Sequence, residues 1–123
     1  MANILCVDDS EIGLFVRQLV LESCGHTVVT ATTAEQALSL FQLAQFDLVV
    51  ADYFLGSKTG EELAQKLKLQ RPHVGVLMLS GSPDVASTAA DAFLVKGGSP
   101  RSLIDAIEGL LEGGEQKARA VGA

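Results

Sequence analysis

Three carboxylates in the first half of the chain follow apolar, strand-like runs of sequence. Asp8 and Asp9 come directly after Ile4-Leu5-Cys6-Val7, and Asp52 comes directly after Leu48-Val49-Val50-Ala51. Continuously apolar runs of this kind are typical of strands that are buried on both faces of a parallel sheet. Because ligands of open α/β sheets bind beyond the carboxyl ends of the strands, we expect the three acids to meet at a binding edge.

Clustered acids need a counter-charge, and this requirement indicates the chemistry. At an effective dielectric constant of ~20, two carboxylates about 4 Å apart repel by roughly 4 kcal/mol, so three of them require a cation or a raised pKa. Their hard oxygen atoms suit Mg²⁺, which keeps several waters and binds phosphate groups. Two more strand-like runs end in Ser80, a hydroxyl donor, and in Lys96, a fixed positive charge. Together these groups match phosphoryl transfer to an aspartate, in which the protein mainly positions groups and neutralises charge.

Five strand-like runs alternate with helix-like segments along the chain. This alternation predicts a (βα)5 fold, an α/β domain with a doubly wound five-stranded parallel sheet that is covered on both faces through right-handed crossovers. The fourth crossover, residues 80–91, is close to the lower limit of about 10–12 residues for a connection that contains a helix. We therefore expect a shortened or irregular fourth helix. The five runs are residues 4–7, 27–31, 48–51, 74–79 and 92–95.

Helix signals fill the segments between these runs. Ser10 is a candidate N-cap for the first helix, and Gly25 is its expected C-terminal glycine. Thr32 or Thr33 is expected to start the second helix, and Thr32 and Glu35 stand at capping-box spacing. A stripe with helical spacing predicts the side of the first helix that faces the core. That stripe consists of Ile12, Phe15, Val16, Leu19 and Val20.

The 123 residues suffice for one domain with a single core. Ser99 as N-cap and Pro100 at the first helical position open the last helix, and Gly113-Gly114 is predicted to end it. We therefore expect one domain over residues 1–112. Residues 113–123 would form a polar C-terminal tail or the start of a linker.

Composition and charge exclude several classes of function. A net charge of −6 and a pI near 4.7 disfavour direct binding to nucleic acid, which relies on basic patches. The apolar runs are too short to span a bilayer, and the first residues lack the basic and apolar regions of a signal peptide, so we expect a cytoplasmic protein that does not bind membranes. Cys6 and Cys24 lack a paired spacing and are predicted to be buried thiols.

The order of these motifs resembles the receiver domain of two-component response regulators. The similarity covers residues 3 to about 112, and although each motif is weak alone, together they form a specific signature because each stands at its own strand end. The resemblance implies a flavodoxin/CheY-like fold with strand order 2-1-3-4-5. It also implies a signalling switch in a phosphorelay that takes part in its own phosphorylation and dephosphorylation, rather than a turnover enzyme. The matching segments are Asp8-Asp9, Asp52 to Gly60, Ser80-Gly81 and Phe93-Leu94-Val95-Lys96.

The resemblance also implies a role for each acid. Asp52 would accept the phosphoryl group from the phosphohistidine of a sensor histidine kinase or phosphotransfer protein. Asp9, Asp52 and the backbone carbonyl of Phe54 would bind Mg²⁺, and Asp8 would act nearby or through a water.

Three further residues would sense the phosphoryl group. Lys96 would pair with its oxygens, Ser80 would move toward it, and Phe93 would turn inward into the space that Ser80 leaves. Phosphorylation would thereby change the face formed by the fourth helix, the fifth strand and the fifth helix, which would contact a downstream protein or effector domain.

Two glycines depart from the family pattern. Gly97 follows Lys96 where the family usually has a proline with a cis bond, and a cis bond before a residue other than proline costs about 2.5–4 kcal/mol, so we expect a trans bond. Gly56 replaces another frequent proline, which should loosen the loop after Asp52. With the shortened fourth crossover, these changes predict an unusual output surface.

Three other functions use similar parts. A flavin-mononucleotide electron carrier needs a phosphate-binding loop after the first strand, where Asp8-Asp9 would repel the phosphate. A phosphohydrolase of the haloacid dehalogenase kind needs Asp-x-Asp there, but in this chain the two acids are adjacent. A receiver-like interaction module that is not phosphorylated fits less well with the complete acidic set, although Gly97 is compatible with it.

Phe54, two residues after the acceptor, suggests a shield for the acyl phosphate. A bulky apolar side chain at this place would hinder the approach of water to the phosphoryl group. We predict that Phe54→Asn speeds the loss of the phosphoryl group, measured by timing dephosphorylation of the purified phosphoprotein. An unchanged or slower rate would contradict the shield.

Overall fold

The computed structural model describes residues 2–81 and 89–122, and a parallel sheet lies at its centre. Its five strands run in the order β2-β1-β3-β6-β7, which is 2-1-3-4-5 when the strands of this sheet are numbered along the chain. The predicted fold is therefore confirmed. The strands are β1 (Asn3–Val7), β2 (Thr27–Ala31), β3 (Leu48–Asp52), β6 (Gly75–Ser80) and β7 (Ala92–Val95).

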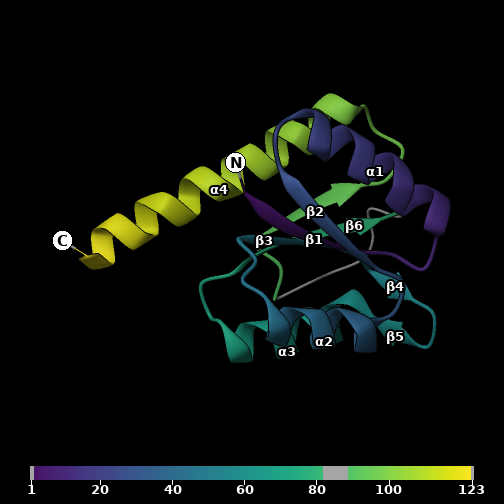
Figure 1. Ribbon diagram of the computed structural model, residues 1–123, viewed down its shortest axis with the longest axis horizontal. Helices are drawn as coiled ribbons and strands as arrows, with labels where there is room; N and C mark the ends of the chain where they lie inside the picture. The colour runs from purple at the N-terminus through teal and green to yellow at the C-terminus, as the bar shows by residue number, and fades with distance from the viewer. Residues whose placement is uncertain (1, 82–88, 123) are drawn as a thin grey trace.

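Helices cover both faces of the sheet (Figure 1). Helices α2 (Ala34–Leu43) and α3 (Gly60–Gln70) pack on one face, where Phe41 and Leu67 are fully buried. Helices α1 (Glu11–Ser23) and α4 (Pro100–Gly122) pack on the other, where Ile107 is fully buried. This arrangement explains why the strands read as continuous apolar runs: both of their faces lie in a core.

The N-caps follow the sequence closely. The Ser10 hydroxyl accepts a hydrogen bond from the backbone amide of Gly13 at 3.2 Å, as predicted. Thr33, one of the two predicted starts of the second helix, is its cap and accepts a hydrogen bond from the amide of Gln36 at 3.0 Å. The Gln36 side chain in turn accepts a hydrogen bond from the amide of Thr32 at 2.9 Å. The predicted pair of Thr32 and Glu35 is therefore wrong by one position.

Helix α1 turns a different side to the sheet than the stripe predicted. Leu14 and Leu21 are buried, with 4% and 1% of their surfaces exposed. They lie seven residues apart and therefore on the same side of the helix. The stripe assigned to the core is instead largely exposed, and half-buried only at its last residue. The exposed fractions are 79% for Ile12, 61% for Phe15, 52% for Val16 and 53% for Leu19.

The orientation of α1 has a polar cause. Arg17 lies on the same side of the helix as Leu14 and Leu21, and its guanidinium group contacts the carboxylate of Asp8 at the edge of the sheet. With 3.6 residues per turn, a helix that turns Arg17 inward must turn Phe15 outward. The apolar stripe misled the prediction because the helix has apolar residues on more than one side.

Three other features differ from the sequence expectations. The loop after Asp52 contains a short hairpin of β4 (Phe54–Leu55) and β5 (Lys58–Thr59). Helix α4 continues through Gly113-Gly114 to Gly122, because the residues around these glycines are mostly good helix formers. Cys6 is buried as predicted, whereas Cys24 is exposed.

Two predictions remain open. The shortened fourth helix falls largely on residues 82–88, which lie outside the described residues, and the boundary between a domain over 1–112 and a tail or linker over 113–123 stays a prediction. Among residues 2–81 and 89–122, no helix combines the length and the apolar character that crossing a membrane requires.

The orientation of α1 predicts opposite results for two leucines of the same helix. Leu21→Ala should lower the free energy of unfolding by about 2–5 kcal/mol, because it leaves a cavity in the core. Leu19→Ala, the matched control on the exposed side, should change it by no more than about 0.5 kcal/mol. Urea unfolding followed by circular dichroism measures both values. Equal losses, or a larger loss for Leu19→Ala, would show that α1 is turned as the apolar stripe suggests.

Candidate functional site

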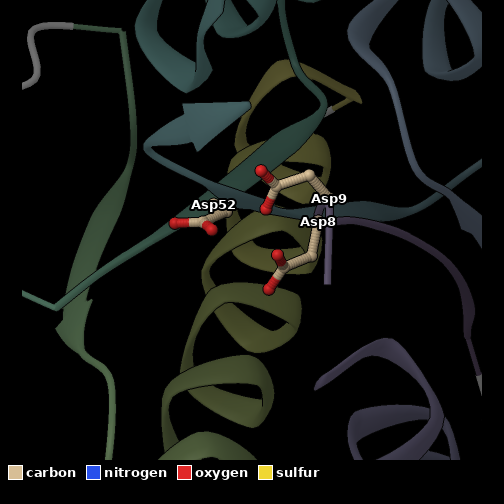
Figure 2. A group of neighbouring side chains, drawn as sticks. All are labelled: Asp8, Asp9 and Asp52. Carbon is tan, nitrogen blue, oxygen red and sulfur yellow. The ribbon is translucent and has the colours of Figure 1, made fainter. Parts of the chain in front are cut away.

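Three carboxylates meet at the carboxyl edge of the sheet. Asp8 and Asp9 follow β1, and Asp52 ends β3, which pairs with β1 in parallel. Figure 2 shows the three side chains next to one another. One oxygen from each carboxylate lies within 4.8 Å of the other two, and Asp8 and Asp52 are buried whereas Asp9 is exposed. The structure thus brings together the acids that the sequence singled out.

Lys96 supplies positive charge to this cluster. Its Nζ atom lies 2.6 Å from Oδ2 of Asp52 and 3.2 Å from Oδ2 of Asp8. Its backbone amide donates a hydrogen bond of 2.7 Å to the carbonyl oxygen of Ser80. The end of β7 therefore fixes the ammonium group between two carboxylates that come from different strands.

Arg17 supplies a second positive charge, which sequence reasoning missed. Its Nη2 atom contacts Oδ2 of Asp8, whose Oδ1 atom accepts a hydrogen bond from the backbone amide of Ser10 at 2.9 Å. A signal for Arg17 was present in the sequence. Ser10, Leu14 and Arg17 share the side of a helix that starts beside Asp8.

These contacts move the pKa values of the two buried acids in opposite directions. Burial acts to raise the pKa of Asp8, but the Ser10 amide, the Arg17 guanidinium and Lys96 together hold it below its ordinary value. Burial raises the pKa of Asp52, and the negative charge of Asp8 adds to this rise, while the hydrogen bond from Lys96 opposes it. Burial would lower the pKa of Lys96, but its hydrogen bonds and ion pairs with Asp52 and Asp8 raise it.

The backbone after Asp52 is held in place by a close approach of α3. The amide of Gly60 donates a hydrogen bond of 2.6 Å to the carbonyl oxygen of Tyr53, whose own amide donates one of 2.7 Å to Leu79. A Cβ atom at Gly60 would lie 2.5 Å from the sulfur of Met78 and closer still to the carbonyl oxygen of Asp52. Residue 60 must therefore be a glycine for α3 to start where it does.

Ser80 lies on β6, the strand next to β3 and Asp52, and Phe93 lies on β7, the strand beyond β6. Ser80 ends β6, is fully buried and pairs with Val95 of β7. Phe93 pairs with Met78 and is half-buried against the core that α2 and α3 cover. Ser80 directly follows Leu79, the β6 residue that pairs with Asp52. Their movement on phosphorylation stays a prediction.

Phe54 and Gly97 border the site. Phe54 is 58% exposed, and its ring meets Tyr53 edge-on with 4.9 Å between the ring centroids. The Lys96–Gly97 bond is trans, as are the other peptide bonds of the described residues, which agrees with the expectation drawn from the missing proline. Gly97 has φ of +89°, a left-handed conformation that favours glycine.

The acidic cluster fits a small divalent cation. Oxygen ligands of one Mg²⁺ lie about 2.0–2.1 Å from the ion and therefore at most about 4.2 Å from one another. The carboxylate oxygens of Asp8, Asp9 and Asp52, all within 4.8 Å of one another, need only small movements to meet this limit. The ligand role of the Phe54 carbonyl stays a prediction.

Known sequences agree with this arrangement. The response regulator receiver domain family matches residues 4–108. The alkaline phosphatase synthesis transcriptional regulatory protein PhoP of Bacillus subtilis is 30% identical over 119 residues, which cover 92% of this chain and 50% of that protein. The chain thus spans about half the length of this curated relative.

Solved structures agree as well. A CheY-like receiver domain protein from Methanospirillum hungatei superposes with a TM-score of 0.87 at 30% identity, and the match covers 95% of this chain and 98% of the other. The response regulator TrrA from Thermotoga maritima, whose structure is a complex with Mg²⁺ and BeF, superposes with a TM-score of 0.84 at 27% identity, covering 89% and 99%.

Proposed function

The chain belongs to the response regulator receiver domain family, and from this membership we propose that Asp52 accepts a phosphoryl group from a phosphohistidine donor in a Mg²⁺-dependent reaction. The observation that carries the proposal is the convergence of three carboxylates and Lys96 at one sheet edge. The donor would be a sensor histidine kinase or a phosphotransfer protein in the cytoplasm.

The chemistry follows from the groups present. An oxygen of the Asp52 carboxylate attacks phosphorus, the bond between phosphorus and the donor's imidazole nitrogen breaks, and that nitrogen keeps the electron pair. Asp9 and Asp52, with Asp8 nearby, would hold the Mg²⁺, which would neutralise charge on the phosphoryl oxygens. Lys96, already 2.6 Å from Asp52, lies where it would pair with one of those oxygens.

The output would be a change of shape at β6 and β7. Ser80 would move toward the phosphoryl group, and Phe93 would turn inward from its half-buried place on β7. Lys96 and Ser80 are joined through their backbones, so a movement at either residue reaches both β6 and β7. The face of β7 and α4, with the segment before β7, would then contact a downstream protein or effector domain.

A small-molecule phosphodonor tests the acceptor. With Mg²⁺ and acetyl phosphate, we predict one phosphoryl adduct in the intact mass spectrum, and we predict that Asp52→Asn abolishes it. Asp105→Asn on the exposed side of α4 is the matched control and should keep the adduct. An adduct that survives in Asp52→Asn would place the acceptor elsewhere, and no adduct from a competent donor would favour a receiver-like interaction module that is not phosphorylated.

The exposed face of α1 is a candidate docking surface for the donor. Ile12, Phe15, Val16 and Leu19 form an apolar face on the helix that follows Asp8 and Asp9 directly. Contiguous apolar surface of this kind marks interaction sites in soluble proteins. A donor protein that packs on α1 would bring its phosphohistidine to the carboxyl edge of the sheet, whereas a small molecule such as acetyl phosphate needs no such surface.

Two classes of donor therefore separate docking from chemistry. Phe15→Ser should slow transfer from a phosphohistidine protein by about tenfold, the equivalent of about 1.4 kcal/mol of lost contact, and leave the rate with acetyl phosphate unchanged. Leu69→Ser on the exposed side of α3 is the matched control and should change neither rate. Transfer rates are measured by quenched-flow with mass detection. An equal slowing with both donors would assign Phe15 to the site itself, and no slowing with either would remove it from the docking surface.

A further inference from the structure

Arg17 contacts a carboxylate oxygen of Asp8 that could otherwise bind a metal. The Oδ2 atom of Asp8 has two cationic partners, Arg17 Nη2 and Lys96 Nζ, and its Oδ1 atom accepts the Ser10 amide. A carboxylate oxygen has about two lone-pair sites. A metal can therefore take Oδ2 of Asp8 only when one of the two cations withdraws.

The contacts indicate which cation withdraws. Lys96 is also held by Asp52 at 2.6 Å and by the backbone of Ser80. Arg17, among the described residues, has its ion pair with Asp8 alone. Lys96 thus stays in the site through Asp52 even if its longer contact with Asp8 is lost. Arg17 is the cation that can leave the site without breaking any ion pair other than the one with Asp8.

Gly13 leaves room beside the contact of Arg17 with Asp8. A Cβ atom built on Gly13 would lie 3.1 Å from Nη2 of Arg17 and 3.5 Å from Oδ2 of Asp8. A side chain at residue 13 would thus press on the guanidinium group where it crosses the helix. The glycine, four residues before Arg17 on the same side of α1, leaves the path to Asp8 open.

The displaced side chain has space beside the site. A cavity of about 370 Å³ lies between α1, β7 and the start of α4, and Arg17 and Asp8 both line it. Val16, Val20 and Leu103 form part of its apolar wall. The aliphatic stem of an arginine packs on such a wall while its charged end reaches water.

We infer that Arg17 is a built-in competitor of the metal: it occupies Asp8 in the metal-free protein, leaves when Mg²⁺ binds, and so sets the Mg²⁺ concentration at which the site can react. This inference rests on the proposed function, because it presupposes that the acidic cluster binds Mg²⁺. It assigns a positioning role to a residue that the receiver resemblance did not single out.

The charge of Arg17 determines by how much, and in which direction, this residue changes the affinity of the site for Mg²⁺. If the guanidinium group stayed about 5 Å from a bound divalent cation, its charge would weaken the binding of that cation by more than tenfold even at the dielectric constant of water, so Arg17 and the metal compete for Asp8. A merely structural role for Arg17, in which it orients Asp8 for the metal, predicts the opposite direction.

Calorimetric titration of the full chain with MgCl₂ distinguishes these roles. Arg17→Met keeps an unbranched stem and removes the charge, so it should lower the dissociation constant for Mg²⁺ by about tenfold or more. Arg17→Lys keeps the charge and should stay close to the wild type. Arg101→Met removes an equal charge from an exposed ion pair on α4 and should also have little effect. If Arg17→Met does not fold, Arg17→Gln, which also removes the charge, should tighten Mg²⁺ binding in the same direction.

A second measurement reports Arg17 directly. In the wild-type protein, the ¹H–¹⁵N signal of the Arg17 Nε–H group, identified by its absence in Arg17→Lys, should shift as Mg²⁺ saturates the site. An unchanged or weaker Mg²⁺ affinity in Arg17→Met, or in Arg17→Gln where it replaces that variant, would overturn the inference and leave the proposed function intact. An Arg17 signal that does not move would do the same. If neither the wild type nor the variant that folds binds Mg²⁺, the metal-dependent function fails, and the inference fails with it.

Discussion

The ammonium group of Lys96 lies between the carboxylates of Asp52 and Asp8, and the layout of the sheet edge depends on this contact. Three carboxylates that meet within a few ångströms repel one another strongly unless a cation lies among them. Parallel strands bring the acids of β1 and β3 to the same edge, and β7, the strand beyond β6, brings the cation. The strand order is therefore an electrostatic requirement of the site as well as a consequence of apolar packing.

The sequence was sufficient for the sheet and for the acids because both depend on local signals. Each buried strand is a continuous apolar run, and each acid follows such a run directly, so the parallel arrangement alone places the acids together. The glycine at position 97, where the family usually has proline, also correctly predicted that the Lys96–Gly97 bond is trans. The strand after the fourth crossover was also found, although that crossover is short.

The sequence was insufficient to predict local details that a tertiary contact or a nearby side chain decides, such as which side of a helix faces the core or which residue caps it. Helix α1 has apolar residues on more than one side, and the ion pair of Arg17 with Asp8 turns Leu14 and Leu21 inward. Thr32 and Thr33 are equally good caps by type, and the side chain of Gln36 favours the second. The two-residue strands of the hairpin after Asp52 are too short to show any periodicity.

The long sequence separations within the site affect how the protein folds. The contacts of Lys96 with Asp52 and Asp8 span 44 and 88 residues. Contacts between residues so far apart in sequence form slowly, because a long loop must close before they contribute any stability. A chain that is still leaving the ribosome, or one in which β7 has come away from the sheet, holds its acids without Lys96. The complete cluster is therefore present only in molecules whose sheet is complete. If Asp52 is the acceptor, as proposed, incompletely folded copies of the protein would carry no signal.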